Sequence, residues 1–469
     1  MNAGEHSADG ARARESVPAI AILVVFVAWS IFWNVIGAFT FGWGPLTFAC
    51  IAGIVVLCEM SPAIGRRLAP RVRVSARAVA IVLACVTLAW LVWHGVTLSH
   101  ALGSGRMVDV GLNTLEAGRR FFDLQGNPYA TRCQLLGVAG APHVTYRGGN
   151  TLMFGVPYYY GYPYYPVQFL VYEPARILLP GIDALRWANV AFLVSGMGGA
   201  FWLAARLAPR TRSLAAGSLA VSLTVGIWAL GFGLFRAGLT DFVIAVLLLY
   251  GVLAMTYEQH ATAGALFALA LGCKLLPGAL LVPIVGVWYA RHAARQARWR
   301  CGVAAVVTLL VTVVPFVVWN PAAFLSATTL YYLTKHAAGD DSSLYWFVPS
   351  FLRLPFLMLG LAIVATMVAR RLRPRAPLSI VDMVALVFTS SMVVTGFNKM
   401  SHLNYFWAVL PLGAVAIAVR LCASERGAES AAGAIDALHT SGPKDQGDLR
   451  SLTTLPSRWD RSPVPPFVQ

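Results

Sequence analysis

The sequence predicts an all-α, polytopic membrane protein, and three observations carry that prediction. First, 58% of the residues are hydrophobic and the mean hydropathy is +0.67, whereas soluble domains are nearer half apolar. Second, the apolar residues fall in repeated runs of roughly 17 to 23, the length that an α-helix needs to cross a hydrocarbon core of about 30 Å. Third, arginines gather in the short breaks between these runs, as they do in cytoplasmic loops.

The distribution of charge and cysteine excludes other classes. The net charge is +16, but the basic residues lie mainly between apolar runs, which indicates membrane orientation rather than nucleic-acid binding. No CxxC pattern occurs, so neither a zinc site nor a disulfide framework is indicated. The seven cysteines are scattered and lie mostly in apolar runs: Cys50, Cys58, Cys85, Cys133, Cys273, Cys301 and Cys422.

The first part of the chain sets the orientation. Residues 1–16 form a polar cytoplasmic segment, and 17–39 form a helix that we expect to be retained, because no short apolar region with a small-residue cleavage site is present. A second run ends near Met60, and five arginines between 66 and 77 mark the cytoplasmic side. A third helix, 78–100, then brings the chain to the outer side. Residues 100–166 are therefore predicted to be an extracytoplasmic loop.

This loop holds the densest charges and aromatic rings of the chain. Its charged residues precede the aromatic segment 156–166, which is built mainly of tyrosine and proline. Charge is what a phosphate-bearing group needs, and tyrosine faces suit a flat or sugar-like group at a lipid surface. We therefore expect the functional face here. The charged residues are Arg106, Asp109, Glu116, Arg119, Arg120, Asp123, Arg132 and Arg147.

The segment 167–179 is predicted to be an interfacial helix rather than a membrane span. It is short and contains Glu173, Pro174 and Arg176, so it suits a helix that lies in the outer interface. Counting it as a span would also place the next arginine cluster, 206–212, outside. The following helix, 184–205, therefore returns the chain to the cytoplasm.

The rest of the chain alternates between the two sides. Arginine-rich stretches at 291–300 and 370–375 are placed inside, and 320–350 forms a second outer loop. The count is about twelve helices in one domain, 17–423, followed by a polar, disordered cytoplasmic tail, 424–469. No internal repeat is evident, which argues against an inverted-repeat transporter. The remaining predicted helices are 214–234, 242–257, 263–272, 278–289, 302–319, 351–368, 380–395 and 405–421.

This topology places many ionisable residues on the outer face. Ionisable groups near membrane helix ends are costly and usually mark a functional cavity. Cations there suit a phosphate, and a carboxylate among them can accept a proton from an attacking hydroxyl. The residues are Asp109, Arg236, Asp241, Lys274, Lys335, Asp340, Asp341, Lys399 and His402.

Six short motifs in order carry a family resemblance. They are Val108–Val110 with 121–129, Tyr162–Pro166, Arg236–Asp241, Gly272–Pro277, Gly339–Leu344 and Lys399–His402. With these motifs, which span roughly residues 80 to 420, the chain resembles the polytopic GT-C glycosyltransferases that use a polyprenyl-phosphate sugar. It is most similar to the bacterial polyprenol-phosphate-mannose-dependent α-mannosyltransferases.

The sequence departs from that branch at three motifs. Asp109 is a single carboxylate where the branch has an acidic pair, and 239–241 reads Leu-Thr-Asp in place of Gln-x-Asn. A common His-His pair is here His402 with Asn404. These departures leave the superfamily resemblance intact and leave the sugar open.

The resemblance implies an inverting transferase in the cytoplasmic membrane with an outer-face active site. The donor would be a polyprenyl-phosphate sugar, with mannose as the expected sugar, and the acceptor a glycan or glycolipid. Membrane lipids would be partners, and nucleic acid would not. Asp109 is the expected base, and no cofactor is expected, with a divalent metal as the alternative. Lys274, Arg236, Lys399 and His402 would hold the donor phosphate, and the substrate-binding residues would be Tyr129, Tyr162, Tyr165, Asp241, Asp340 and Asp341.

Each candidate has a simpler explanation. Asp109 could cap a helix; its apolar neighbours favour the protonated form, whereas Arg106 favours the carboxylate. Glu116 and Asp123 could be solvated loop charges, and Lys274 could snorkel to the membrane surface. The remaining alternatives are a solvated turn for Asp340 and Asp341, a backbone hydrogen bond for His402, and an interfacial belt for the tyrosines.

Two other functions compete with transfer. A transporter or flippase of lipid-linked sugars would need polar groups through the mid-membrane, whereas here the ionisable residues gather on one face. A non-catalytic scaffold that binds lipid carriers would not need Asp109.

Overall fold

The computed structural model describes residues 109–130, 144–145, 151–152, 161–179, 181–230, 240–330, 348–371, 378–397, 408–420 and 422–423. The regular secondary structure of this part is helical apart from one antiparallel pair of short strands, β1 (Val144–Thr145) and β2 (Thr151–Leu152). The predicted helices before residue 101 and the predicted tail lie outside the described residues.

In chain order, the first described helices are α5 (Asp109–Phe122), α6 (Pro166–Leu178), α7 (Ile182–Leu207), α8 (Ser213–Leu230), α10 (Phe242–Thr256) and α11 (His260–Cys273). They continue with α12 (Leu275–His292), α13 (Arg295–Thr312), α14 (Val314–Trp319), α15 (Pro321–Leu325), α17 (Arg353–Arg371) and α18 (Ile380–Phe397). A last helix covers Leu410–Arg420. Short turns of other helix types lie at Arg210–Arg212, Ser326–Leu330 and Ser350–Leu352.

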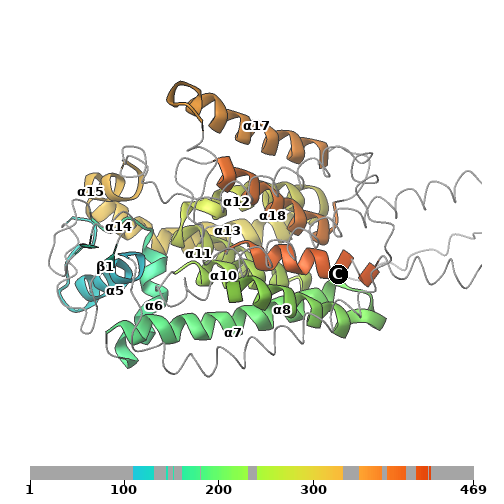
Figure 1. Cartoon of the computed structure of the whole chain (residues 1–469), viewed down its shortest axis with the longest axis horizontal. Coiled ribbons are helices and arrows are strands. Elements are labelled where there is room, and N and C mark those ends of the chain that lie inside the picture. Colours follow the sequence, from blue (N-terminus) through green and yellow to red (C-terminus); the bar gives the residue numbers. More distant parts are fainter. Residues whose placement is uncertain are drawn as a thin grey trace, which may run out of the picture. The chain divides into compact units, whose positions relative to one another are not determined.

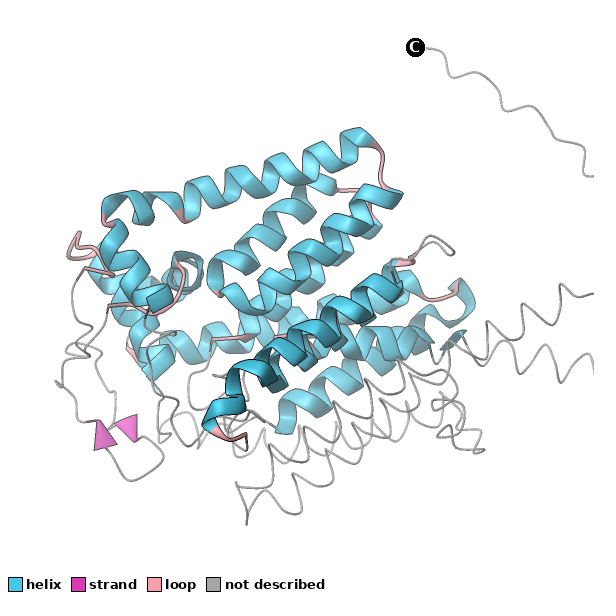
Figure 2. Cartoon of the chain, turned by 90° about the horizontal axis from the view of Figure 1, so that it is seen from above, coloured by secondary structure: helices cyan, strands magenta, loops and turns pink. Residues whose placement is uncertain are grey.

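The core is a layer of antiparallel helices in which α7 packs on α8 and α10, and α11 packs on α10 and α13 (Figures 1 and 2). Helix α10 is apolar on all sides, as Ile244, Ala245, Leu248 and Leu249 are fully buried, which suits a central helix. Two glycines allow close packing. A Cβ at Gly251 would lie 2.5 Å from the Phe267 ring, and one at Gly264 would overlap the backbone of Cys301 in α13. Small residues serve this purpose between membrane helices.

Side-chain contacts identify one end of this layer. The guanidinium of Arg206, near the end of α7, lies 5.1 Å from the Tyr257 ring, just after α10. His260 at the start of α11 contacts the hydroxyl of Tyr289, near the end of α12, at 3.2 Å. The starts and ends of these helices therefore alternate as the sequence predicts, and the arginines at 206–212 share an end with the 257–260 turn.

The opposite end brings together Asp241, Lys274 and the segment before α6. The backbone N–H of Tyr165 donates to the carbonyl of Cys273 at 3.3 Å, and Lys274 reaches Asp241. The predicted grouping of Asp241 and Lys274 away from the arginine clusters is thus confirmed.

Several outer surfaces are apolar. Two described helices have the length and composition to cross a membrane, Asp183–Leu207 and Ser350–Arg370. Most of each is unburied: Trp202 on α7 and Leu354 on α17 are exposed, which suits contact with lipid. The described residues confirm the predicted all-α class, and these two helices fit the predicted membrane protein.

Most helix bounds differ from prediction by a few residues, and two segments differ more. The expected loop 100–166 includes α5, whose Leu112 and Leu115 are buried, so its charged stretch is an amphipathic helix. The expected helix 302–319 begins earlier, at Arg295, and breaks at Val313; α14 then begins at Val314, with Pro315 in its first turn. Arginine is a good helix former, so the basic stretch continues the helix instead of forming a loop.

Candidate functional site

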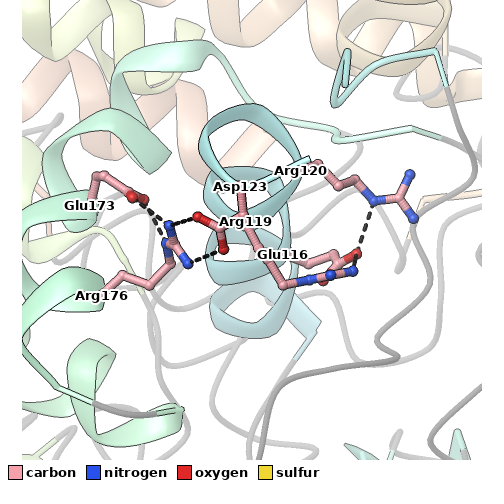
Figure 3. Close-up of polar contacts among 6 residues, drawn as sticks. All are labelled: Glu116, Arg119, Arg120, Asp123, Glu173 and Arg176. Atoms are coloured by element: carbon pink, nitrogen blue, oxygen red, sulfur yellow. Dashed lines mark hydrogen bonds and ion pairs between the residues drawn. The ribbon is translucent and has the colours of Figure 1, made fainter. Parts of the chain in front are cut away.

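Helix α5 places an acid inside the protein. Asp109 is its first residue, and Glu116, two turns on, is fully buried. Arg119 and Arg120 donate to the Glu116 carboxylate through their Nε atoms at 2.8 and 2.9 Å (Figure 3). The interpretation of Glu116 as a solvated loop charge is therefore wrong, because the helix buries its side chain and supplies two cations one turn away.

A second group of charges ties α6 to α5. Arg176 donates to Asp123 through Nη1 and Nη2 at 2.8 and 2.7 Å, and its Nη2 also donates to Glu173 at 2.6 Å (Figure 3). This hydrogen bond from Arg176 holds the pKa of Asp123 below its usual value. Asp123 is 47% exposed. Glu173 and Arg176, which argued against a membrane span at α6, thus form a cluster of ion pairs with Asp123 that joins α6 to α5.

The tyrosines form a packed aromatic cluster rather than an open surface. The rings of Tyr129 and Tyr162 are buried and 5.9 Å apart, and the Tyr129 hydroxyl donates to the carbonyl of Tyr164 at 2.9 Å. Burial raises the pKa of Tyr129 well above its usual value, so the hydroxyl stays protonated. Phe316 of α14 and Phe324 of α15 complete the packing.

Neither a sugar-binding surface nor an interfacial belt fits all three predicted tyrosines, Tyr129, Tyr162 and Tyr165. Tyr129 and Tyr162 present no open face for stacking, and they are not exposed to lipid as a belt would be. Tyr165 is partly exposed and packs its ring edge on Phe324 at 5.6 Å between ring centroids. Tyr129 and Tyr162 therefore act as a support beneath Tyr164 and Tyr165.

The centre of the site is an ion pair between two of the predicted residues. The Nζ of Lys274 lies 2.6 Å from Oδ1 of Asp241, and the two residues are 5% and 2% exposed. Lys274 sits in extended backbone between α11 and α12, and Asp241 immediately precedes α10. The ammonium also lies 4.9 Å from the centroid of the Tyr164 ring. Lys274 is thus buried in a pair and does not snorkel.

A layer of uncharged polar groups continues from this pair. The Nε2 of Gln168 on α6 donates to Oγ1 of Thr240, the residue before Asp241, and lies 3.4 Å from Oγ1 of Thr114 on α5. The Thr114 hydroxyl in turn contacts the Tyr162 hydroxyl at 3.3 Å. Four separate segments of the chain therefore meet in one buried polar region.

Two buried carboxamides on α5 and α6 have atoms without a hydrogen-bond partner. They are both amide atoms of Asn113 and Oε1 of Gln168, and both residues are fully buried. Each buried polar atom without a partner lowers the free energy of unfolding by about 1–3 kcal/mol. Sequence reasoning missed both residues. The signal for Asn113 was its position one turn after Asp109 on an amphipathic helix.

The remaining predicted site residues lie outside the described part of the chain. They are Arg236, Lys399, His402, Asp340 and Asp341, and of Asp109 only the position in α5 is described. Among the described residues, no group of three or more His, Cys, Asp and Glu side chains is placed to hold a metal ion.

No family model and no curated protein matches this sequence. Two solved structures resemble it, both of ArnT from Cupriavidus metallidurans. The chain is 17% identical to the form bound to undecaprenyl phosphate, with a TM-score of 0.44, covering 72% of this chain and 59% of that one. For the apo form the identity is 17%, the TM-score 0.45 and the coverage 74% and 60%. The chain thus matches about three fifths of the length of these proteins, and its activity has to be inferred from its own site.

Proposed function

We propose that this protein is a membrane glycosyltransferase that moves a sugar from a polyprenyl-phosphate donor to a glycan or glycolipid acceptor with inversion. The sugar is mannose, and the site faces the outer side of the cytoplasmic membrane. The observation that carries the proposal is the buried pair of Lys274 and Asp241 against the ring of Tyr164.

The pair suits a phosphate at a lipid surface. An ammonium is a compact cation that binds phosphate. A buried ammonium interacts more strongly with a phosphate because little water screens the two charges. Asp241 fixes the direction of the Lys274 side chain through the ion pair, so Asp241 acts through the lysine. Arg236, five residues before Asp241, is proposed to supply a second cation, and Lys399 and His402 complete the donor phosphate site.

Asp109 is the proposed base. The acceptor hydroxyl oxygen forms a bond to the anomeric carbon while its proton passes to the Asp109 carboxylate. The bond from that carbon to the phosphate oxygen breaks, and its electron pair leaves with the polyprenyl phosphate. Lys274 stabilises the charge that develops there, as oxyanion groups do.

The aromatic segment holds the other parts of the substrates. Tyr165 is partly exposed at the start of α6, and the buried Tyr129 and Tyr162 fix its position. Asp340 and Asp341 are proposed to bind acceptor hydroxyls. The proposal needs no metal, because a phosphate is already a fair leaving group; a divalent metal is the alternative.

The test is incubation of the purified full chain in detergent with labelled polyprenyl-phosphate sugars and a glycan acceptor mixture. We expect transfer from the mannosyl lipid and loss of transfer in the Asp109→Asn variant. Binding of the lipids without transfer by the unmodified chain would indicate a scaffold. Movement of intact lipid-linked sugar across vesicles without transfer would indicate a flippase. Either result contradicts the proposal.

A further inference from the structure

Two buried carboxamides on α5 and α6 have unused hydrogen-bonding atoms. Asn113 is fully buried, and neither its amide nitrogen nor its amide oxygen has a partner. Gln168 is also fully buried, and its Oε1 has none. If the Gln168 amide is turned over, the nitrogen becomes the atom without a partner. In either orientation the two residues together offer both donors and acceptors.

One of these carboxamides, Gln168, is linked to the ion pair through continuous contacts. Gln168 bonds to Thr240, which precedes Asp241, and Asp241 holds Lys274. On the other side Gln168 contacts Thr114, the neighbour of Asn113 on α5. The unused Oε1 of Gln168 therefore belongs to the same buried layer as the proposed phosphate site, and Asn113 is the residue next to Thr114 on the helix that this layer contacts.

The chemistry of the unused atoms indicates a neutral ligand rich in hydroxyl groups. An anion would need cations, whereas a carboxamide both donates and accepts, as a hydroxyl does. Buried polar groups are almost always paired in native proteins, so unpaired ones within a candidate site indicate groups that a substrate satisfies.

We propose that Asn113 and Gln168 are positioning residues that bind hydroxyls of the donor's sugar. This inference rests on the proposed function, which places the phosphate of the same donor at Lys274. Residues four apart share one face of a helix, so Asn113 lies on the face of α5 that begins with Asp109. The sugar then lies between the proton acceptor and the phosphate, as displacement at the anomeric carbon requires.

The chain offers a matched control. Asn189 on α7 is also fully buried, but its Oδ1 accepts from the Tyr172 hydroxyl at 2.5 Å. Replacing it with leucine leaves that hydroxyl unpaired, whereas the same change at Asn113 removes atoms that have no partner. The two substitutions are chemically identical and differ in what they leave behind.

The experiment compares the unmodified chain with Asn113→Leu, Gln168→Met, Asn189→Leu and Lys274→Ala in detergent. Affinities are measured for a polyprenyl phosphate and for the same lipid carrying mannose, and thermal unfolding is followed without lipid. We expect the unmodified chain to prefer the mannosyl lipid. Asn113→Leu and Gln168→Met lose that preference by about tenfold, the effect of one lost hydrogen bond in a buried site, and keep their affinity for the lipid without sugar. Lys274→Ala loses affinity for both lipids.

Unfolding separates a binding role from a structural one. Asn113→Leu is expected to be at least as stable as the unmodified chain, and Asn189→Leu to be less stable with its lipid preference unchanged. If Asn113→Leu does not fold, Asn113→Ala is judged by the same lipid preference. An unchanged preference in the Asn113 and Gln168 variants overturns this inference alone. An unmodified chain that binds neither lipid overturns the proposed function and this inference with it.

Discussion

Lys274 and Asp241 lie 33 positions apart in the sequence and are joined by one short ion pair. Each was predictable separately, because a charge at the end of an apolar run is costly and invites a functional explanation. Their contact was not, because nothing local to either residue specifies which helix ends meet. The pairing depends on how α10 and α11 pack.

Changing Lys274 to alanine is expected to weaken donor binding and turnover by about 2–4 kcal/mol. It also removes the cation that pairs with the buried Asp241, which costs about 3–5 kcal/mol of folding stability. The double variant Lys274→Met, Asp241→Asn removes both charges, so it should recover much of the stability while donor binding stays lost. Thermal unfolding and donor affinity measured on both variants test this; recovery of donor binding in the double variant would contradict a role in holding phosphate.

Changing Asp109 to asparagine keeps the shape of the residue and removes the base. Turnover should fall by roughly 10²-fold or more while donor affinity survives. Steady-state rates together with an equilibrium binding measurement separate the two quantities. Near-normal transfer by this variant would assign the proton to another carboxylate, with Asp340 and Asp341 as the next candidates.

At the scale of elements, the short helix α6 was predictable and α5 was not. Glu173 and Arg176 made 167–179 too polar to span a membrane, and the structure has a helix there, Pro166–Leu178. α5 escaped prediction because its apolar residues Leu112 and Leu115 are separated by polar residues and followed by charged ones, and a search for apolar runs of about 20 residues passes over such a helix. The partners of Glu116 are on its own helix, so an analysis of i, i+3 and i, i+4 pairs would have found them.

The ion pair of Asp123 with Arg176, which joins α5 to α6, leads to a prediction about the pH dependence of stability. Asp123 has a pKa in the folded protein below its unfolded value of about 3.9, so its contact with Arg176 stabilises the fold above that value. The contribution is lost as the pH falls through the folded pKa. Because Asp123 is 47% exposed, solvent screens the contact and its worth is about 0–1 kcal/mol.

Asp123→Asn is therefore expected to change stability slightly at neutral pH and to remove this part of the acid dependence. Arg176→Gln should cost more, because it also leaves the buried Glu173 without its partner. Thermal unfolding of the three proteins between about pH 3 and 7 measures both effects. Equal losses for the two variants at neutral pH would mean that Glu173 does not depend on Arg176.

At the scale of the whole molecule, the arginine clusters predicted the relative directions of α7, α10, α11 and α12. The ends that carry Arg206 and Tyr257 lie together, and Asp241 and Lys274 meet at the opposite end. Hydropathy and charge suffice for this result, because each apolar helix has to traverse the layer once and each basic break fixes an end. They do not specify which helices touch. That depends on small residues such as Gly251 and Gly264, where a side chain would collide with the neighbouring helix.

The same topology predicts which segments an impermeant thiol reagent reaches in intact cells. Single cysteines at Ser104 and Ser342, in a variant otherwise free of cysteine, should both be labelled because the two outer loops share the extracytoplasmic side. Gln259→Cys is the control, since this exposed residue lies in the turn beside Tyr257 at the opposite end and should react only after the cells are opened. Labelling at only one of Ser104 and Ser342 would break the alternation in a segment between them. Labelling of both together with Gln259 in intact cells would show that the reagent had crossed the membrane, and a bulkier reagent would then decide. If Gln259 alone is labelled, the whole layer is inverted, and the Lys274–Asp241 end faces the cytoplasm instead of the side on which we propose sugar transfer.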